Sequence, residues 1–139
     1  MTVKAARNTL LHQLAGIADQ HEDFLYGRCA TLAIAMHRFT GAPIYGLVGY
    51  SEEEGRDVLV HAYVKLVSDT RVDIKGPRAL DEILADFLHV EDVFLPDVGE
   101  LRLTERTVAK YATGSASCPS LSEAMPLAKR IWAITQKLL

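Results

Sequence analysis

The sequence predicts an α+β domain in which a buried central helix packs on a small antiparallel sheet, with further helices after it. The segment 30–36 is apolar nearly all round, and a helix that is apolar on every side is buried on every side. The run 57–67 is rich in β-branched and aromatic residues, which is typical of a strand. A short turn at 68–70 joins this run to the next, so the two strands are expected to pair antiparallel.

Composition indicates one ordinary domain over residues 1–139. The chain is 49% hydrophobic and 24% charged, which allows a sizeable core. A net charge of -3 without a basic block argues against a nucleic-acid partner. No apolar run approaches the roughly 20 residues of a membrane span, and residues 10–14 are too short and polar for a signal peptide. We therefore expect a cytoplasmic protein, with Sec-independent export left open and the oligomeric state not indicated.

Two helices are expected before the sheet. Asn8 or Thr9 is a suitable cap for a first helix that ends near Asp19. Its apolar face consists of Leu10, Leu11, Leu14, Ile17 and Ala18. The second helix begins at or near Cys29 and ends at residue 39 or 40, because Gly41 is a natural C-terminal stop.

The sheet and the later helices follow from local patterns. Strands are expected over residues 43–50, 57–67, 71–74 and, with a weaker pattern, 90–95. A third helix is expected to start at Pro77 or Arg78 and to end at residue 87 or 88. Thr104 is a candidate cap for a helix to about residue 111, residues 113–120 form a loop, and a last helix runs from about 122 to 139.

Three residues on these elements have the chemistry of a nucleophile, a base and an orienting carboxylate. At a helix N-terminus, unpaired amides and the helix dipole favour the thiolate of Cys29. Strand alternation is expected to point His61 to the same side as Leu59 and Tyr63. A hairpin centred near residues 68–69 brings Asp73 roughly opposite His61, where it can accept a proton from one ring nitrogen.

This order of residues resembles the papain-like cysteine enzymes in the broad sense. That group includes peptidases, transglutaminase-like proteins, arylamine N-acetyltransferases and bacterial effector domains. The resemblance covers about residues 24–88 and is carried by Gly27-Arg28-Cys29, His61-Ala62 and Val72-Asp73 with Gly76. It implies a cysteine at the start of a central helix, a histidine on the first core strand and an aspartate on the next. The segment Asp73-Ile74-Lys75-Gly76, in which a glycine follows the aspartate by three residues, is most similar to small bacterial and phage-associated members of this group.

The sequence departs from papain-type peptidases before the cysteine. Those enzymes carry a glutamine there as the side-chain half of the oxyanion hole, whereas this chain has Asp23 and Tyr26, with Gln20 further back. An ionised carboxylate cannot donate to an oxyanion. Tyr26, Gln20 and backbone amides are the candidate donors, and Tyr63 joins Tyr26 as a candidate for lining the substrate site.

The expected function is hydrolysis of an amide or isopeptide bond in a protein or peptide substrate, through Cys29, His61 and Asp73. Transglutamination, deamidation and acyl transfer pass through the same acyl-enzyme and remain alternatives. A protein-binding module on the same scaffold, with Cys29 merely packed, is the non-catalytic alternative.

Other features carry less chemistry. Cys118, before a proline in a small-residue loop, is expected to be a free thiol without a role. No paired CxxC or HxxxH spacing occurs, so no metal is expected, and the reaction requires no cofactor. Residues 98–139 show no recognisable chemistry.

Overall fold

The computed structural model describes residues 2–21, 24, 29–87, 97–112 and 121–139, and it confirms the α+β class. Its five-stranded antiparallel sheet has the strand order β4-β3-β2-β1-β5. The elements are α1 (Val3–Gln20), α3 (Cys29–Thr40), β1 (Ile44–Ser51), β2 (Arg56–Lys65), β3 (Arg71–Asp73), β4 (Gly76–Arg78), α4 (Leu80–Ala85), β5 (Gly99–Leu103), α5 (Glu105–Ala112) and α6 (Leu121–Leu138). None of the helices within these ranges has the length and apolar character that a membrane span needs.

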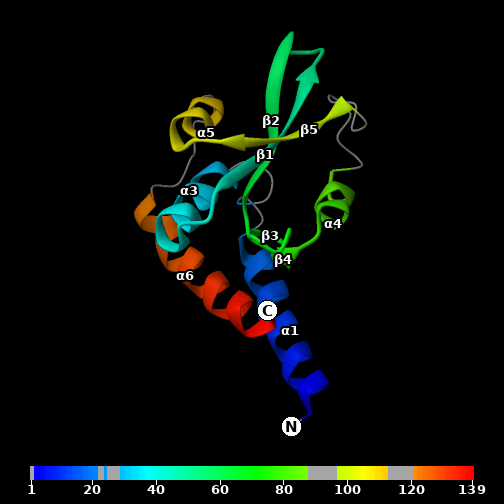
Figure 1. Cartoon of the computed structure of the whole chain (residues 1–139), viewed down its shortest axis with the longest axis vertical. Helices are drawn as coiled ribbons and strands as arrows, with labels where there is room; N and C mark the ends of the chain where they lie inside the picture. The colour runs from blue at the N-terminus through cyan, green and yellow to red at the C-terminus, as the bar shows by residue number, and fades with distance from the viewer. Residues whose placement is uncertain (1, 22–23, 25–28, 88–96, 113–120) are drawn as a thin grey trace.

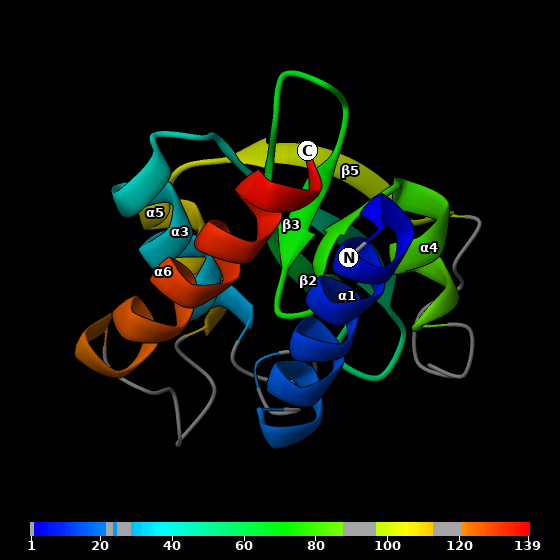
Figure 2. The same ribbon diagram turned by 90° about the horizontal axis from the view of Figure 1, so that it is seen from below.

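The helices surround the sheet unevenly. α3, α5 and α6 gather to one side of the strands and α4 lies on the other, while the β1–β2 hairpin extends away from the body (Figure 1). Figure 2 shows α1 and α6 beneath the β3–β4 end of the sheet. Arg7 Nη1 on α1 donates to the carbonyl of Leu138, at 3.3 Å, so the last turn of α6 is tied to α1. The β3–β4 hairpin is therefore held between α1, α4 and α6.

Helix α3 is the buried central helix that the sequence predicts. Seven of its twelve residues are buried, and it packs on both α6 and β2. Gly41 ends it with a φ of +78°, a left-handed conformation that glycine adopts without a Cβ penalty, and its N–H donates to the carbonyl of His37. Cys29 is the first described residue of α3, and residues 25–28 before it lie outside the described ranges.

Helix α1 begins earlier than predicted. Thr2, not Asn8 or Thr9, is the N-cap, and its Oγ1 accepts the N–H of Ala5 at 3.0 Å. The first turns lie on the surface and have no apolar periodicity, so the hydrophobic pattern alone placed the start too late. Leu14 and Ile17 are buried as expected, whereas Leu11 is 44% exposed.

A bulge in β2 overturns one predicted orientation. Leu47 pairs with His61, but the next residue of β1, Val48, pairs with Leu59, so β2 has one extra residue between them. Neighbouring residues of β1 face opposite sides, and therefore Leu59 and His61 also face opposite sides.

The predicted helix start at Pro77 or Arg78 is wrong, because both residues belong to the edge strand β4. Gly76 has a φ of +89°, which reverses the chain directly after Asp73, and Pro77 pairs with Val72. Proline is tolerated on an edge strand, where no further strand needs its N–H. Helix α4 begins only at Leu80.

The end of the chain is partly as predicted. Thr104 caps α5 by accepting the N–H of Thr107 at 3.1 Å, and α6 forms where a last helix is expected. Strand β5, which pairs with β1, was not predicted, because it is short and most of its residues are exposed. The strand predicted at 90–95 and the loop at 113–120 lie outside the described residues.

Candidate active site

His61 and Asp73 form a buried hydrogen-bonded pair. The register of β2 and β3 pairs Val64 with Val72, which places Tyr63 across from Asp73 and His61 two residues further along the same face. His61 Nε2 lies 2.8 Å from Asp73 Oδ2, and the two side chains are 0% and 2% exposed. The structure therefore brings the predicted base and carboxylate together, diagonally rather than directly opposite.

Three groups hold the Asp73 carboxylate in place. The N–H of Lys75 donates to Oδ1 at 2.9 Å, and Arg78 Nη2 donates to Oδ2 at 2.6 Å. His61 occupies the same Oδ2. Arg78 Nη1 in turn donates to Asp86 at 2.7 Å, and Lys75 Nζ donates to Asp86 at 2.9 Å. Asp73 is thus the centre of a network that extends from β2 to the C-terminal end of α4.

The charges of this network favour a protonated ring. Burial on its own lowers the pKa of His61, but the hydrogen bonds and charges of Asp73 and Cys29 outweigh it and raise that pKa to about 9. Burial would raise the pKa of Asp73, but the bonds and charges of His61 and Arg78 lower it below its usual value. The pair is therefore an imidazolium and a carboxylate at neutral pH.

Cys29 is the third group at this ring. It is 8% exposed and belongs to the same apolar cluster as Ala62, the neighbour of His61 in the sequence. His61 Nε2 is occupied by Asp73, and the buried Nδ1 has no hydrogen bond of standard geometry among the described residues. Cys29 contributes to the raised pKa of the ring, and Nδ1 is the ring nitrogen that Asp73 does not occupy. Such contacts are often loose before substrate binds.

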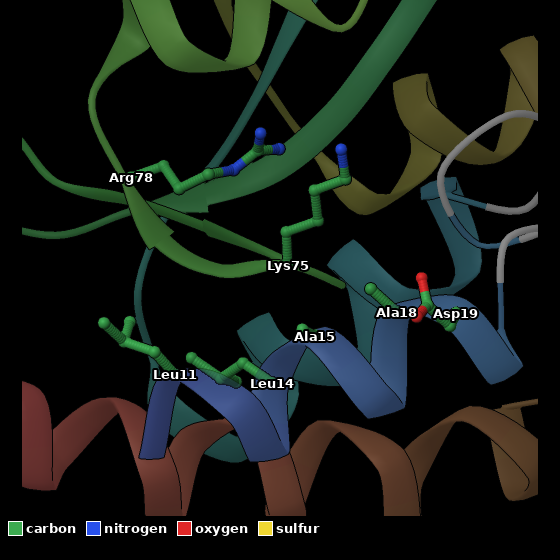
Figure 3. A pocket seen from close by; sticks show the side chains of 7 residues that line it. All are labelled: Leu11, Leu14, Ala15, Ala18, Asp19, Lys75 and Arg78. Atoms are coloured by element: carbon green, nitrogen blue, oxygen red, sulfur yellow. The ribbon is translucent and has the colours of Figure 1, made fainter. Parts of the chain in front are cut away.

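Helix α1 braces the hairpin that carries Asp73. A Cβ at Gly76 would come within 2.6 Å of Leu14 Cδ1, so the helix packs directly against this turn. Beside this contact lies a pocket of about 290 Å³, with four apolar side chains of α1 and Asp19 on one side and Lys75 and Arg78 on the other (Figure 3). In Figure 3 the charged ends of Lys75 and Arg78 point away from α1. The pocket is therefore lined by their aliphatic stems, and their charges face the Asp73 network.

The candidate oxyanion and substrate residues are not assembled by the described chain. Gln20 is exposed as the last residue of α1. Tyr63 is fully buried and its hydroxyl donates to Glu100, so that hydroxyl is not available to a substrate. Tyr26, like Asp23 and Cys118, lies outside the described residues.

Sequence reasoning missed Arg78 and Asp86, which complete the network around Asp73. A signal was present, since Lys75 and Arg78 are two cations on either side of the turn at Gly76, directly after the candidate carboxylate. Within the described ranges, no group of three or more His, Cys, Asp and Glu side chains is arranged so that it could hold a metal ion.

Comparisons of the chain with protein-family models, with curated proteins and with solved structures find no match. The function of the site is therefore inferred from the chemistry of Cys29, His61, Asp73 and their partners.

Proposed function

We propose that the chain is a cysteine-dependent acyl-transfer enzyme that hydrolyses an amide or isopeptide bond in a protein or peptide substrate of the cytoplasm. The observation that carries the proposal is the buried bond of 2.8 Å between His61 Nε2 and Asp73 Oδ2, on a ring that also interacts with Cys29. A thiol, an imidazole and a carboxylate that interact in this order fit the roles of nucleophile, base and orienter.

In the proposed reaction, the proton of the Cys29 thiol has passed to His61 Nδ1, so that the ring is an imidazolium, and Cys29 Sγ bonds to the carbonyl carbon of the substrate. The carbonyl π electrons move to oxygen, and the main-chain amide of Cys29 is a candidate donor to that oxyanion. The intermediate collapses as His61 returns its proton to the leaving amine, and the C–N bond breaks. Water, deprotonated by His61, then cleaves the thioester to give a carboxylic acid and the free thiol.

Asp73 supports each of these proton transfers. Its Oδ2 accepts the Nε2–H of the ring, which fixes the tautomer and directs Nδ1 away from the carboxylate. It also compensates the positive charge that the ring acquires next to the sulfur. If an amine replaces water in the last step, the same site performs transglutamination or acyl transfer.

The burial of the site favours a second candidate, a protein-binding module without catalysis. His61 has no exposed surface and Cys29 is only 8% exposed. In that case the network around Asp73 stabilises the hairpin, and the thiol is a packed core residue.

Alkylation by iodoacetamide at about pH 6 separates the two candidates, because a free thiol is almost fully protonated there. The protein carries Cys118→Ser so that Cys29 is the one remaining thiol. We expect rapid alkylation of this protein, none after Cys29→Ala, and a rate at least about tenfold lower after His61→Ala. His12→Ala removes an exposed histidine on α1 and is the matched control with an unchanged rate. A slow rate in the parent, or one that His61→Ala leaves unchanged, contradicts the enzyme and supports the binding module.

A further inference from the structure

We propose that Arg78 is a positioning residue that acts on His61 through Asp73, and that it limits how firmly Asp73 holds the proton-carrying ring. The inference rests on the proposed function, since it assigns a role in the proton transfers of that same site. Nothing in the sequence pattern of the nucleophile, base and carboxylate calls for an arginine at this position.

The geometry shows two cations on one oxygen. His61 Nε2 and Arg78 Nη2 both donate to Asp73 Oδ2, at 2.8 Å and 2.6 Å. A guanidinium is charged at every working pH, so Arg78 remains a charged donor to this oxygen whether or not the ring is protonated. The negative charge of Asp73 is therefore divided between a permanent partner and a titrating one.

Arg78 is fixed on both sides. Its other terminal nitrogen donates to Asp86 at 2.7 Å, and Lys75 Nζ holds the second oxygen of that carboxylate at 2.9 Å. The aliphatic stem faces the apolar side chains of α1 across the pocket of Figure 3, and the side chain is only 12% exposed. Because neither its head nor its stem is free to swing into solvent, Arg78 can hold the Asp73 carboxylate in one orientation.

The groups around His61 account for its charge environment. Cys29 comes from α3, Asp73 from β3 and Arg78 from β4 through Asp73. The rings of Tyr63 and Phe87 lie 6.0 Å and 5.1 Å from the imidazole. Asp86 acts on His61 indirectly, through its bond to Arg78, and Lys75 Nζ acts through its bond to Asp86.

The chemistry explains why such a limit is useful. A base in acyl transfer has to take the thiol proton and later return it to the leaving group, which is easiest when its pKa lies near the working pH. If Asp73 were paired with His61 alone, the ring would hold its proton more firmly and return it more slowly. Arg78 therefore makes the imidazolium less stable, and this makes it easier for His61 to return its proton to the leaving group.

The proposal is tested by removing the positive charge of Arg78 in one variant and the negative charge of Asp86 in another, and by comparing the pKa of His61 in the two. The pKa of His61 is read by NMR titration of the folded, histidine-labelled chain, with His61→Ala to assign the signal. Arg78→Met keeps the aliphatic stem and removes the charge, and we expect the pKa of His61 to rise by roughly one pH unit. Asp86→Asn leaves Arg78 with Asp73 as its remaining carboxylate, and we expect that pKa to fall. Arg78→Lys keeps the charge without the two-pronged contact, so its shift should be the smaller one.

A merely structural role predicts the opposite shift in Arg78→Met, because loosening Asp73 lowers the pKa of His61. A pKa that falls or stays unchanged in Arg78→Met therefore overturns the proposal. If circular dichroism shows that Arg78→Met does not fold, Arg78→Lys decides: a pKa of His61 that falls or stays unchanged in Arg78→Lys overturns the proposal, as does a pKa that rises or stays constant in Asp86→Asn.

The same samples distinguish this proposal from the proposed function. Alkylation of wild-type Cys29 at about pH 6 tests the enzyme, irrespective of Arg78. If Cys29 alkylates as expected but Arg78→Met leaves the His61 titration unchanged, only the role of Arg78 is refuted. If Cys29 does not alkylate, the enzyme is refuted, and a role of Arg78 in proton transfer is refuted with it, even where the titration shifts.

Discussion

Two polar clusters lie on the same face of the sheet and differ in how completely they are paired. One is centred on Asp73, with His61 and Arg78, and the other on Glu100 of β5. Strand pairing puts Glu100 opposite Leu47, and Leu47 in turn opposite His61, so the two clusters are neighbours across β1.

In the Glu100 cluster, both carboxylate oxygens of Glu100 have hydrogen-bond or ion-pair partners. Arg71 donates to both carboxylate oxygens at 2.8 Å and 2.9 Å, Lys65 Nζ lies 3.3 Å from Oε1, and the Tyr63 hydroxyl donates to Oε2. The bonds to Arg71, against some burial, lower the pKa of Glu100 to about 2. The side chains of this cluster direct their charges at one another.

The Asp73 cluster is not fully paired, because two of its nitrogens, Arg78 Nε and His61 Nδ1, are buried without a standard hydrogen bond among the described residues. His61 Nδ1 is buried without a standard hydrogen bond in the described part of the chain, and the side chain that interacts with the ring is a cysteine. A protein that used this cluster only for stability would gain by satisfying that nitrogen. The comparison therefore indicates a structural role for Glu100 and a chemical role for His61.

Replacing Asp73 should have the largest effect on reactivity. Asp73→Asn removes the charge that supports the imidazolium, and we expect alkylation of Cys29 at about pH 6 to slow by roughly 100-fold. The rate is measured on protein shown to be folded by circular dichroism, and Asp57→Asn, at an exposed position of β2, is the control. A rate within a few-fold of wild type would mean that Asp73 is structural, like Glu100.

Replacing Glu100 should lower the stability of the fold and leave the reactivity of Cys29 unchanged. Glu100→Gln leaves Arg71 buried without its carboxylate, so we expect the free energy of unfolding to fall by about 3 kcal/mol. Alkylation of Cys29 in the folded protein should not change. Denaturant unfolding gives the stability, with Glu52→Gln in the exposed turn as the control. A loss of reactivity without a loss of stability would reverse the roles of the two clusters.

The turn between Asp73 and Arg78 tests how far the Asp73 cluster depends on its support. Gly76→Ala places a Cβ at a φ of +89° and against Leu14, and we expect a loss of about 2 kcal/mol in unfolding free energy. Gly16→Ala, on α1 with open space around it, should instead stabilise by up to about 1 kcal/mol. Equal effects of the two substitutions in thermal unfolding would contradict the packing described for Gly76.

Stability should depend on pH in the way that a raised histidine pKa requires. The folded pKa of His61, about 9, lies above the ordinary value of 6.5, so its contribution is complete below pH 6.5 and is lost as pH rises through 9. Asp73 has a lowered pKa, so its contribution exists above its usual range and is lost at acid pH. Urea unfolding between pH 6.5 and 9 should show the decline in wild type and less of it in His61→Gln. Parallel curves would contradict the assignment.

The pairing of His61 and Asp73 was predictable because it depends on local rules. Strand alternation and a short turn connect residues only 12 positions apart, and the burial of α3 follows from the apolar residues on all its sides. The role of Arg78 was not predicted because the sequence pattern placed this residue at the start of a helix. In the structure, the left-handed conformation of Gly76 turns the chain back, so that Arg78 lies in strand β4.

The Glu100 cluster could not be predicted from local patterns. Glu100 is 29 residues from Arg71 and 37 from Tyr63 in the chain, and the strand that carries it has only five residues, most of them exposed. Only the antiparallel addition of β5 to β1 brings these groups together. The bulge that turns Leu59 away from His61 is likewise a property of strand pairing, which the sequence of β2 alone does not specify.

The central claim is that Cys29 and His61 act as one unit, and the titration of His61 in the presence and absence of the thiol tests it most directly. We predict that His61 titrates near pH 9 in the wild-type chain and at clearly lower pH in Cys29→Ala, because the sulfur contributes to the raised pKa. The same titration in both proteins would show that the ring does not interact with Cys29, and would contradict the proposed enzyme.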